Sequence, residues 1–264
     1  MNAVPHNVAV VILAAGKGAR LGCADIPKAM LPIGGKPMTA YLVETLESMG
    51  FTKEQIVLVV GFQKEKVKEY FGNQVTYAVQ DEQLGTGHAV AVAEPYIRNK
   101  FDHTVVVYGD MPLISANSTG RLVQNHTNNN TPMTMLTALT PDFAGDHAPF
   151  AMFGRVVRNS NGEFEKIVEW KDASEKQLEI TELSTGIFCF QTDWLFENLR
   201  RLNADNVQKE YYLVDLVALA MESGGVSTAE VSLSEVYGVN TAKDLETILK
   251  KVALTSSHHL IHHI

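Results

Sequence analysis

A loop of small residues near the start of the chain could bind an anionic group. An apolar run ends at Leu13, and the segment Leu13–Arg20 then reads Leu-Ala-Ala-Gly-Lys-Gly-Ala-Arg. Because small side chains leave backbone N–H groups accessible, such a loop can point several donors at a phosphate. Arg20 and Lys28 add positive charge beside it, which a triphosphate needs while one phosphate is attacked. The loop residues concerned are Leu13, Ala14, Ala15, Gly16 and Gly18.

The spacing of this loop differs from the two common nucleotide-binding motifs. It matches neither the dinucleotide pattern G-x-G-x-x-G nor the Walker loop G-x-x-x-x-G-K-[ST]. Gly-x-Gly alone is equally typical of a tight turn in which glycine only permits close packing, but Arg20 and Pro27-Lys28 favour phosphate chemistry. An NAD-dependent dehydrogenase is disfavoured, since Gly61-Phe62-Gln63 stands where a ribose-binding acid is expected.

An acidic residue follows a second apolar run. Asp110 comes directly after Thr104–Tyr108 and Gly109. It is therefore predicted to lie at the carboxyl end of a buried strand, where open α/β sheets bind their ligands. A carboxylate there could hold Mg²⁺, which prefers a few protein oxygens together with phosphate oxygens. A turn or a helix cap is the structural alternative, because aspartate favours both.

The elements that must position these residues alternate along the first half of the chain. Val8–Leu13 is continuously apolar and rich in β-branched residues, which predicts a strand buried on both faces. A helix is expected between Pro37 and Gly50. The alternation that follows predicts a wound, largely parallel sheet. The other predicted elements here are strands at Ile56–Val60, Val75–Val79 and Thr104–Tyr108, and helices at Lys64–Phe71 and His88–Tyr96.

The pattern changes after about residue 130 and predicts an antiparallel extension. Asn161-Gly162 separates two strand-like segments, which indicates a hairpin. Because no Pro- or Ser-rich linker divides the chain, we expect one α/β domain over residues 1–252, with halves at about 7–130 and 131–240, and a disordered tail at 253–264. The predicted elements are strands at Met133–Ala138, Phe153–Arg158, Glu163–Trp170 and Leu183–Phe190, and helices at Asp193–Leu202, Tyr212–Glu222 and Ala242–Val252.

The overall composition is that of an acidic globular protein. The formal net charge of −8 argues against a nucleic-acid binder, which usually carries a basic field. The apolar run Val8–Ala15 is too short to cross a bilayer, so we expect no membrane segment and a cytoplasmic location. Cys23 and Cys189 lack metal-ligand spacing and are expected to be reduced thiols. The composition leaves the oligomeric state, including a homo-oligomer, open.

Several motifs together resemble those of the sugar-1-phosphate nucleotidyltransferases. Leu-Ala-Ala-Gly-x-Gly-x-Arg followed by Pro-Lys is similar to their signature. Gln80–Ala89 resembles the uridine-binding stretch of the uridyltransferase domain of bacterial N-acetylglucosamine-1-phosphate uridyltransferases. Tyr108–Ile114 resembles their metal-binding strand end, and Gly238–Asn240 their second metal position. Further segments follow in the family's order, so that the resemblance spans roughly residues 7 to 250: Gly154–Val156, Ile167–Glu169, Lys171–Ala173, Ser184–Ile187 and Glu210–Leu213.

The resemblance implies a Rossmann-like fold and a Mg²⁺-dependent transfer from UTP to a sugar 1-phosphate, most closely N-acetylglucosamine 1-phosphate. The implied catalytic residues are Arg20, Lys28 and Asp110. Asp110 and Asn240 are the implied metal ligands, although Asn240 could equally cap the following helix. Nucleotide contacts are implied for Leu13, Ala14, Ala15, Gly16, Gly18, Lys28, Gln80, Gln83, Gly85, Thr86, Tyr108 and Gly109 in the first half. Sugar contacts are implied for Gly154, Glu169, Ser184, Tyr212 and Asn240.

Some positions depart from the uridyltransferase pattern and leave alternatives open. Ser184 stands in place of an asparagine and Val214 in place of a threonine, while Pro27–Pro32 is closer to glucose-1-phosphate enzymes. Uridylyl or thymidylyl transfer to glucose 1-phosphate or another sugar phosphate is therefore one alternative, and a non-catalytic nucleotide-sugar sensor is another. Residues 250–264 contain no hexapeptide repeat, so we expect no acetyltransferase activity from this chain. His88 is expected to be structural rather than a general base.

Overall fold

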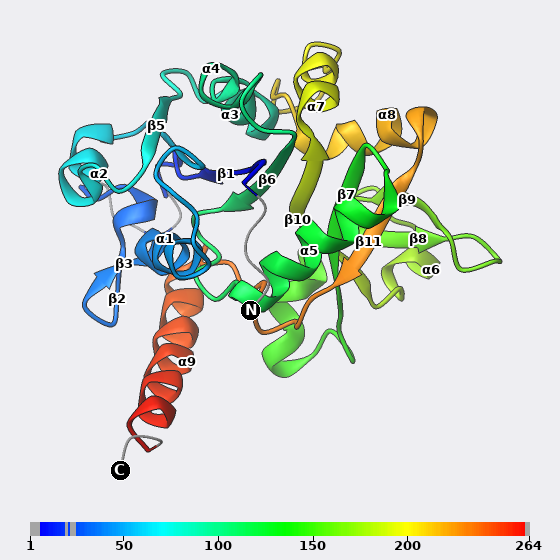
Figure 1. The fold of residues 1–264 in the computed structure, drawn as a ribbon. Coiled ribbons are helices and arrows are strands. Elements are labelled where there is room, and N and C mark those ends of the chain that lie inside the picture. The colour runs from blue at the N-terminus through cyan, green and yellow to red at the C-terminus, as the bar shows by residue number, and fades with distance from the viewer. Residues whose placement is uncertain (1–5, 19–20, 22–24, 262–264) are drawn as a thin grey trace.

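One large sheet runs through the protein, with helices on both of its faces (Figure 1). The computed structural model describes residues 6–18, 21 and 25–261. The strands are β1 (Val8–Leu13), β2 (Pro32–Ile33), β3 (Lys36–Pro37), β4 (Ile56–Val60), β5 (Thr76–Val79), β6 (His103–Tyr108), β7 (Met133–Leu139), β8 (Arg155–Arg158), β9 (Phe164–Val168), β10 (Glu182–Gln191) and β11 (Val226–Glu230). The sheet order is β11-β7-β10-β6-β1-β4-β5, with β8 and β9 joined to β10, while β2 and β3 form a separate small sheet.

The first half has the predicted parallel core. β1 pairs in parallel with β4 and with β6, and β4 pairs in parallel with β5. The chain builds outward from β1 to β5 and then returns to place β6 on the other side of β1. The strand order therefore reverses between β1 and β6, which is where open α/β sheets bind ligands. Leu13 faces Tyr108 at the carboxyl ends of these strands.

The second half extends the same sheet through an antiparallel strand. β10 is antiparallel to both β6 and β7, and β11 returns parallel to β7. The hairpin predicted at Asn161-Gly162 is formed by β8 and β9, with Gly162 at a positive φ of 79°. The predicted fold class, a mostly parallel Rossmann-like sheet with an antiparallel extension, is confirmed.

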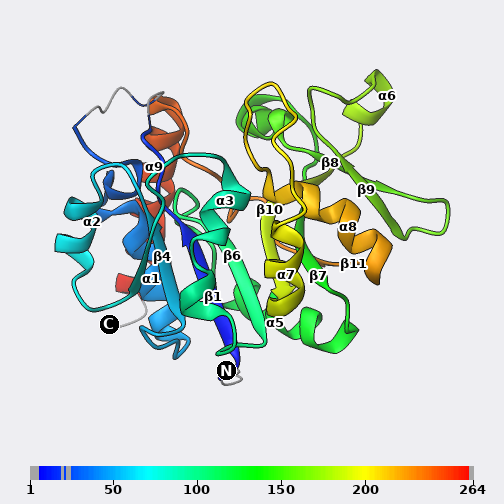
Figure 2. The same ribbon diagram turned by 90° about the horizontal axis from the view of Figure 1, so that it is seen from above.

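The helices form two layers that bury alternate side chains of β1. They are α1 (Met38–Ser48), α2 (Lys64–Phe71), α3 (Thr86–Ala91), α4 (Glu94–Ile97), α5 (Ala116–Asn129), α6 (Glu175–Leu178), α7 (Thr192–Leu199), α8 (Leu216–Ser223) and α9 (Ala242–Ile261), with 3-10 turns η2 (Lys28–Met30), η3 (Gly145–Met152) and η4 (Leu213–Asp215). Val8, Val10 and Ile12 pack in the layer of α1, α2, α5 and α9, whereas Ala9 and Val11 pack in the layer of α3, α4, α7 and α8 (Figure 1). Seen from above, the β8–β9 hairpin and α6 lie at the far end from α2 (Figure 2).

Some helices differ from the sequence prediction. The single helix expected over His88–Tyr96 is two short ones, α3 and α4. Pro95 explains the break, because proline lacks an N–H and its ring clashes with the carbonyl four residues earlier. α9 continues to Ile261, past Val252, where the tail was expected to begin. α5 and β11 were not predicted. No helix in the described ranges is both long enough and apolar enough to cross a membrane.

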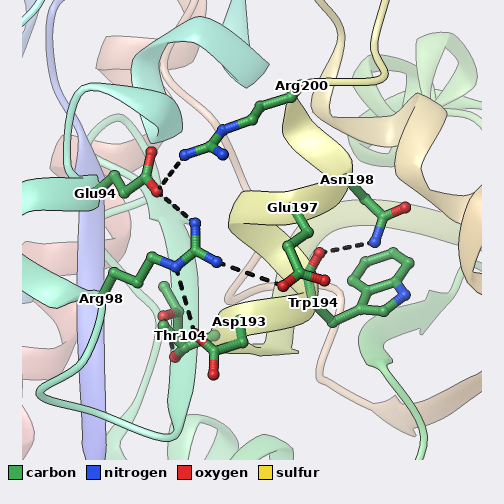
Figure 3. A network of polar contacts seen from close by, with 9 residues as sticks. Glu94, Arg98, Thr104, Asp193, Trp194, Glu197, Asn198 and Arg200 are labelled. Atoms are coloured by element: carbon green, nitrogen blue, oxygen red, sulfur yellow. Dashed lines mark hydrogen bonds and ion pairs between the residues drawn. The ribbon is translucent and has the colours of Figure 1, made fainter.

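A polar network joins the two halves on the side of α4 and α7 (Figure 3). Arg98 donates to Glu94 at 2.8 Å and lies 3.4 Å from Glu197 on α7. Arg200, just after α7, donates to the same Glu94 at 2.9 Å. These contacts tie the end of α4, from the first half, to α7, from the second.

Candidate active site

The first predicted loop leaves β1 directly beside the end of β6. The Gly109 N–H donates to the Leu13 carbonyl at 2.9 Å, and the Ala14 N–H donates to the carbonyl of Val59 at 3.0 Å. A Cβ on Gly109 would lie 2.9 Å from Thr39 Oγ1 and 3.3 Å from the Ala14 Cβ. Any larger residue at position 109 would therefore collide with Thr39 and crowd the end of β1. Leu13, Ala14 and Gly109 thus build the switch point at which the sequence places phosphate chemistry.

The rest of this loop reaches Gln83 and Lys28. Gln83 Nε2 donates to the Ala15 carbonyl at 2.6 Å, which joins the loop to the predicted base-binding stretch. Gly16 is exposed, and a Cβ on it would meet nothing within 4 Å. Gly18 has a φ of +67°, and its Cβ would lie 3.1 Å from the Lys28 Cβ. The loop therefore runs past the lysine, as expected.

Arg20 lies outside the described residues, so its catalytic role stays a prediction.

Lys28, Asp110 and Asn240 come together from three separate segments. Lys28 begins η2, Asp110 follows β6, and Asn240 lies just before α9. The Lys28 ammonium contacts the Asp110 carboxylate and donates to Asn240 Oδ1 at 2.8 Å. The Lys28 and Asp110 side chains are mostly buried, with 17% and 19% of their surface exposed. The structure thus unites residues that are widely separated in the sequence.

The cap of α9 comes from Thr241, not from Asn240. Thr241 Oγ1 accepts from the Asp244 N–H at 3.2 Å, and Asp244 Oδ2 accepts from the Thr241 N–H at 2.8 Å. This reciprocal pair is a capping box in which aspartate takes the place of the usual glutamate. The Asn240 side-chain oxygen is therefore directed at Lys28 rather than at the helix.

Asp110 and Asn240 fit a hard divalent cation. Each presents an oxygen to the same ammonium nitrogen, so both can reach a single cation. Mg²⁺ is usually bound by one or two protein groups, with substrate phosphates and water supplying the other oxygens. In the part of the chain that the structure describes, no group of three or more His, Cys, Asp or Glu could hold a metal. Substrate phosphates and water would supply the other oxygens of a cation held by Asp110 and Asn240.

The stretch predicted to bind the base is internally braced. Gln80 is only 4% exposed, and its Nε2 donates to the Gly85 carbonyl at 3.1 Å and lies 3.2 Å from His88 Nδ1. Gln80 is therefore not an exposed strand residue. His88 is paired within the same stretch, in keeping with a structural role.

Gly85 and Thr86 are locked against a segment of the second half. A Cβ on Gly85, whose φ is +103°, would lie only 2.6 Å from the Tyr211 carbonyl oxygen. Thr86 Oγ1 accepts from the Leu213 N–H at 2.9 Å. The predicted base-binding residues thus lie where the two halves meet.

Three of the predicted sugar-binding residues converge at a second position. The Ser184 N–H donates to the Gly154 carbonyl at 2.9 Å. A Cβ on Gly154 would lie 3.3 Å from Glu169 Oε1 and 3.5 Å from the Ser184 Cβ. The Ser184 hydroxyl, however, donates to the Met135 sulfur at 3.4 Å. Met135 is completely buried.

A bulge in β10 connects this position to the end of β6. The pairing of β10 with β7 shifts register between Ser184 and Phe188. Within the bulge Gly186 has a φ of +76°, and a Cβ on it would lie 2.9 Å from the Tyr108 ring. Bulges often re-aim side chains beside active sites. Here the bulge packs β10, the strand that carries Ser184, against Tyr108, which precedes Asp110 by two residues.

Carboxylates of both positions act on Tyr108, whereas those that act on Tyr212 include Glu169 but not Asp110. Burial raises the pKa of Tyr108, and the carboxylates of Asp110 and Glu169 raise it further. Desolvation also raises the pKa of Tyr212, with contributions from Glu169 and Asp215 among its acidic neighbours. The pKa of Glu169 itself is raised, first by desolvation and then by Asp172 and Asp215. Tyr108 is therefore within electrostatic reach of both the Asp110 centre and Glu169, and Tyr212 is within reach of Glu169.

Comparison with known proteins agrees with this geometry. Residues 10–206 match the family described as the MobA-like NTP transferase domain. The chain belongs to this family. The match includes most of β1, all of β6, the predicted base position and the predicted sugar residues Gly154, Glu169 and Ser184, and it ends before Tyr212 and Asn240.

Curated relatives of this MobA-like NTP transferase domain carry the name Bifunctional protein GlmU. The relative from Geobacillus thermodenitrificans is 42% identical over 232 residues, which is 87% of this chain and 48% of the relative. The relative from Exiguobacterium sibiricum is 41% identical over 250 residues, or 93% of this chain and 54% of the relative. The chain thus spans about half the length of the curated relatives it matches. The resemblance stated from the motifs is confirmed.

A solved structure shares the fold of this MobA-like NTP transferase domain. It comes from Bacillus anthracis, is assigned as a glucose-1-phosphate thymidylyltransferase and was determined with sucrose. The superposition has a TM-score of 0.74 at 22% identity and covers 92% of this chain and 94% of that one. At this identity the likeness concerns the fold alone.

Three residues that the sequence analysis missed hold the segment around Asn240 in the candidate site. Tyr237, Thr241 and Asp244 surround Asn240 but were not predicted to matter. The pattern Thr-x-x-Asp, just before an apolar helical run, was the signal that could have identified the cap.

Proposed function

We propose that this chain transfers a uridylyl group from UTP to a sugar 1-phosphate, N-acetylglucosamine 1-phosphate in the first instance, and releases pyrophosphate. The convergence of Lys28, Asp110 and Asn240 at the switch point of the sheet is the observation that carries the proposal. The similarity to relatives named GlmU favours it, as does the order of the motifs along the chain. The same proposal includes a cytoplasmic location, where these substrates are found.

The chemistry requires positioning and charge stabilisation more than proton transfer. An ionised oxygen of the sugar phosphate attacks the α-phosphorus of UTP. The bond from that phosphorus to the oxygen bridging to the β-phosphate breaks, and pyrophosphate leaves with the electron pair. No proton has to move, which agrees with the structural role of His88. Lys28, together with Arg20, would stabilise the charge that develops on the pyrophosphate.

Asp110 and Asn240 are the residues that would hold Mg²⁺ in this proposal. Their carboxylate and amide oxygens are of the hard type that Mg²⁺ prefers. When bound, the cation would supply positive charge to the phosphate oxygens around the reacting phosphorus. In the structure Lys28 shares both oxygens, so the lysine and the cation would compete for them.

The two halves would each recognise one substrate. The 80–86 stretch offers the Gln80 amide and the backbone around Gly85, and an amide can both donate to and accept from the edge of a pyrimidine. On the other side, the Glu169 carboxylate can accept from sugar hydroxyls beside Gly154. Tyr212, close to Glu169, would contact the sugar phosphate.

A different sugar 1-phosphate is the second candidate substrate, and Ser184 is the residue that favours it. Its hydroxyl donates to the buried Met135 sulfur at 3.4 Å and is turned toward the core. A serine in this orientation offers no two-headed amide contact to an N-acetyl group. Glucose 1-phosphate, which lacks that group, would not need one.

The test measures pyrophosphate release by the purified chain with Mg²⁺. UTP and dTTP would each be supplied with N-acetylglucosamine 1-phosphate or with glucose 1-phosphate. We expect release that requires Mg²⁺, is abolished by EDTA and is fastest with UTP and N-acetylglucosamine 1-phosphate. Preference for glucose 1-phosphate would move the sugar specificity and leave the reaction class intact. A folded protein that releases no pyrophosphate from any pair would contradict the proposed reaction and favour a nucleotide-sugar sensor.

A further inference from the structure

We infer that Asp244 is a positioning residue that sets the Asn240 side chain for metal binding, an inference that rests on the proposed function. Asp244 is a buried carboxylate, 8% exposed, in the first turn of α9. It does not reach Lys28 or Asp110 in any contact of the described chain. Its effect is therefore exerted through the residue that it holds.

Both oxygens of Asp244 are engaged. Oδ2 accepts from the Asn240 N–H at 3.0 Å and from the Thr241 N–H at 2.8 Å. Oδ1 accepts from the hydroxyl of Tyr237 at 3.2 Å. Hydrogen bonds to an ionised acceptor are about twice as strong as neutral ones. The Asp244 carboxylate therefore fixes the backbone at Asn240 and at Thr241, the residue that caps α9.

This arrangement does more than an ordinary helix cap requires. The capping box of α6, made by Ser174 and Gln177, joins only those two residues. In α9 the Asp244 carboxylate also accepts from the N–H of Asn240, one residue before the cap, and from the hydroxyl of Tyr237. One additional bond thus holds the residue proposed to bind the metal, and the other braces the carboxylate that holds it.

The opposite side of Asn240 is held against β6. The Val239 N–H donates to the Asp110 carbonyl at 3.0 Å, so the residue just before Asn240 is bonded to the backbone of the other proposed ligand. A Cβ on Gly238 would lie 3.3 Å from Asn240 Nδ2. The amide nitrogen thus packs over Gly238, which leaves Oδ1 for Lys28. Asp244 adds a restraint on the Asn240 backbone itself, because it accepts the N–H of that residue.

The test compares Asp244→Asn with Gln177→Ala, which alters the equivalent position of the α6 capping box. Partners of metal ligands typically contribute about 10- to 100-fold to metal affinity or activity. We expect Asp244→Asn to raise the Mg²⁺ concentration for half-maximal pyrophosphate release by about tenfold or more. The KM for UTP at saturating Mg²⁺ should stay unchanged. The Gln177→Ala variant should show the same Mg²⁺ dependence as the wild type.

A second readout does not depend on turnover. Binding of Mn²⁺ in the presence of UTP, followed by electron paramagnetic resonance, should weaken by the same factor in Asp244→Asn. If Asp244→Asn fails to fold, Tyr237→Phe removes only the bond to Oδ1 and should give a smaller shift in the same direction. Wild-type metal dependence and Mn²⁺ binding in a folded variant would overturn the inference. Absence of turnover in the wild type would instead contradict the proposed function, and Mn²⁺ binding would still test the role of Asp244.

Discussion

The side chains of Lys28 and Asp110, 82 positions apart in the chain, form an ion pair at the topological switch point. The same ammonium donates to Asn240 Oδ1 at 2.8 Å. The negative charge that a divalent cation needs is therefore already balanced before any substrate binds. In the proposed reaction, Lys28 would be able to stabilise the leaving group only when another cation takes its place beside Asp110 and Asn240.

Asp110→Asn should lower kcat by about 10²- to 10³-fold, the range typical for loss of one group that stabilises transition-state charge. The substitution keeps the shape of the side chain but removes the charge that faces Lys28. Pyrophosphate release at saturating substrates measures the effect, and circular dichroism checks the fold. Glu197→Gln is the matched control. It also removes a carboxylate charge that faces a cation, since Glu197 Oε1 lies 3.4 Å from Arg98 Nη2. Unchanged turnover in Asp110→Asn would remove Asp110 from the mechanism.

Gly85→Ala should destabilise the protein and raise the KM for UTP. The new Cβ would lie 2.6 Å from the Tyr211 carbonyl oxygen and 2.8 Å from the Tyr211 nitrogen, so the backbone must move. Gly35→Ala separates this clash from conformational strain, since Gly35 also has a positive φ of +94° but has open space around it. Strain of this kind costs about 1–3 kcal/mol. We expect a clearly larger loss of unfolding free energy in Gly85→Ala, measured by urea denaturation; equal losses would contradict the clash.

Thr192→Val should cost about 1–3 kcal/mol, the usual penalty for a buried hydroxyl left without a partner. Thr104 Oγ1 and Thr192 Oγ1 lie 2.8 Å apart, and both residues are buried. Replacing both threonines by valine should recover much of the loss, because no polar group then remains unpaired. Urea unfolding of the two single variants and the double variant provides the cycle. If the double variant loses as much unfolding free energy as the two single variants together, an unpaired hydroxyl is not the cause of the destabilisation.

Stability should fall as the pH decreases from about 6.5 to about 4, in part because of His126. Burial and the nearby His103 lower the pKa of His126 from 6.5 to about 4, and its side chain is only 1% exposed. The unfolded chain therefore binds more protons than the native one in this window, and the stability that is complete above pH 6.5 is lost on acidification. The size is on the order of 3 kcal/mol.

His126→Asn tests this assignment, since the asparagine amide can still reach Thr134 Oγ1, which lies 2.9 Å from His126 Nδ1. The slope of unfolding free energy against pH should become shallower between pH 4.5 and 6.5. Burial also lowers the pKa of His103, against the opposing charge of Asp102, and the two rings lie 5.0 Å apart edge to face. Part of the slope should therefore remain in the variant, and an unchanged slope would point to other groups.

The centre of the fold was predictable because its strands carry strong local signals. Val8–Leu13 and Thr104–Tyr108 are apolar enough to identify buried parallel strands, and the small residues after them mark the switch point. The edge strand β11 was missed, because Val-Ser-Thr-Ala-Glu has little apolar content and is stabilised by pairing with β7. α5 was missed because its sequence is rich in Asn, Ser and Thr, and only Ser115 signals its start.

The motifs suggested which residues form the candidate site, but they did not indicate the bonds between those residues. The motifs identified Asn240, yet nothing in them says whether its side chain caps a helix or faces Lys28. That choice depends on Thr241 taking the cap and on Tyr237 and Asp244 packing behind it. The orientation of Ser184 toward Met135 is likewise set by the register of β10 on β7, a long-range property.

The position of β10 has a consequence for how the chain is made. Its residues, Glu182–Gln191, occupy the gap between β6 and β7, which are synthesised earlier. During translation the two older strands cannot join, and the hydrophobic edge of β6 stays unpaired until residue 191 has left the ribosome. Strand edges exposed in this way favour aggregation and slow folding. Until β10 is inserted, the open edge of β6 is therefore a surface on which a strand of another chain could pair.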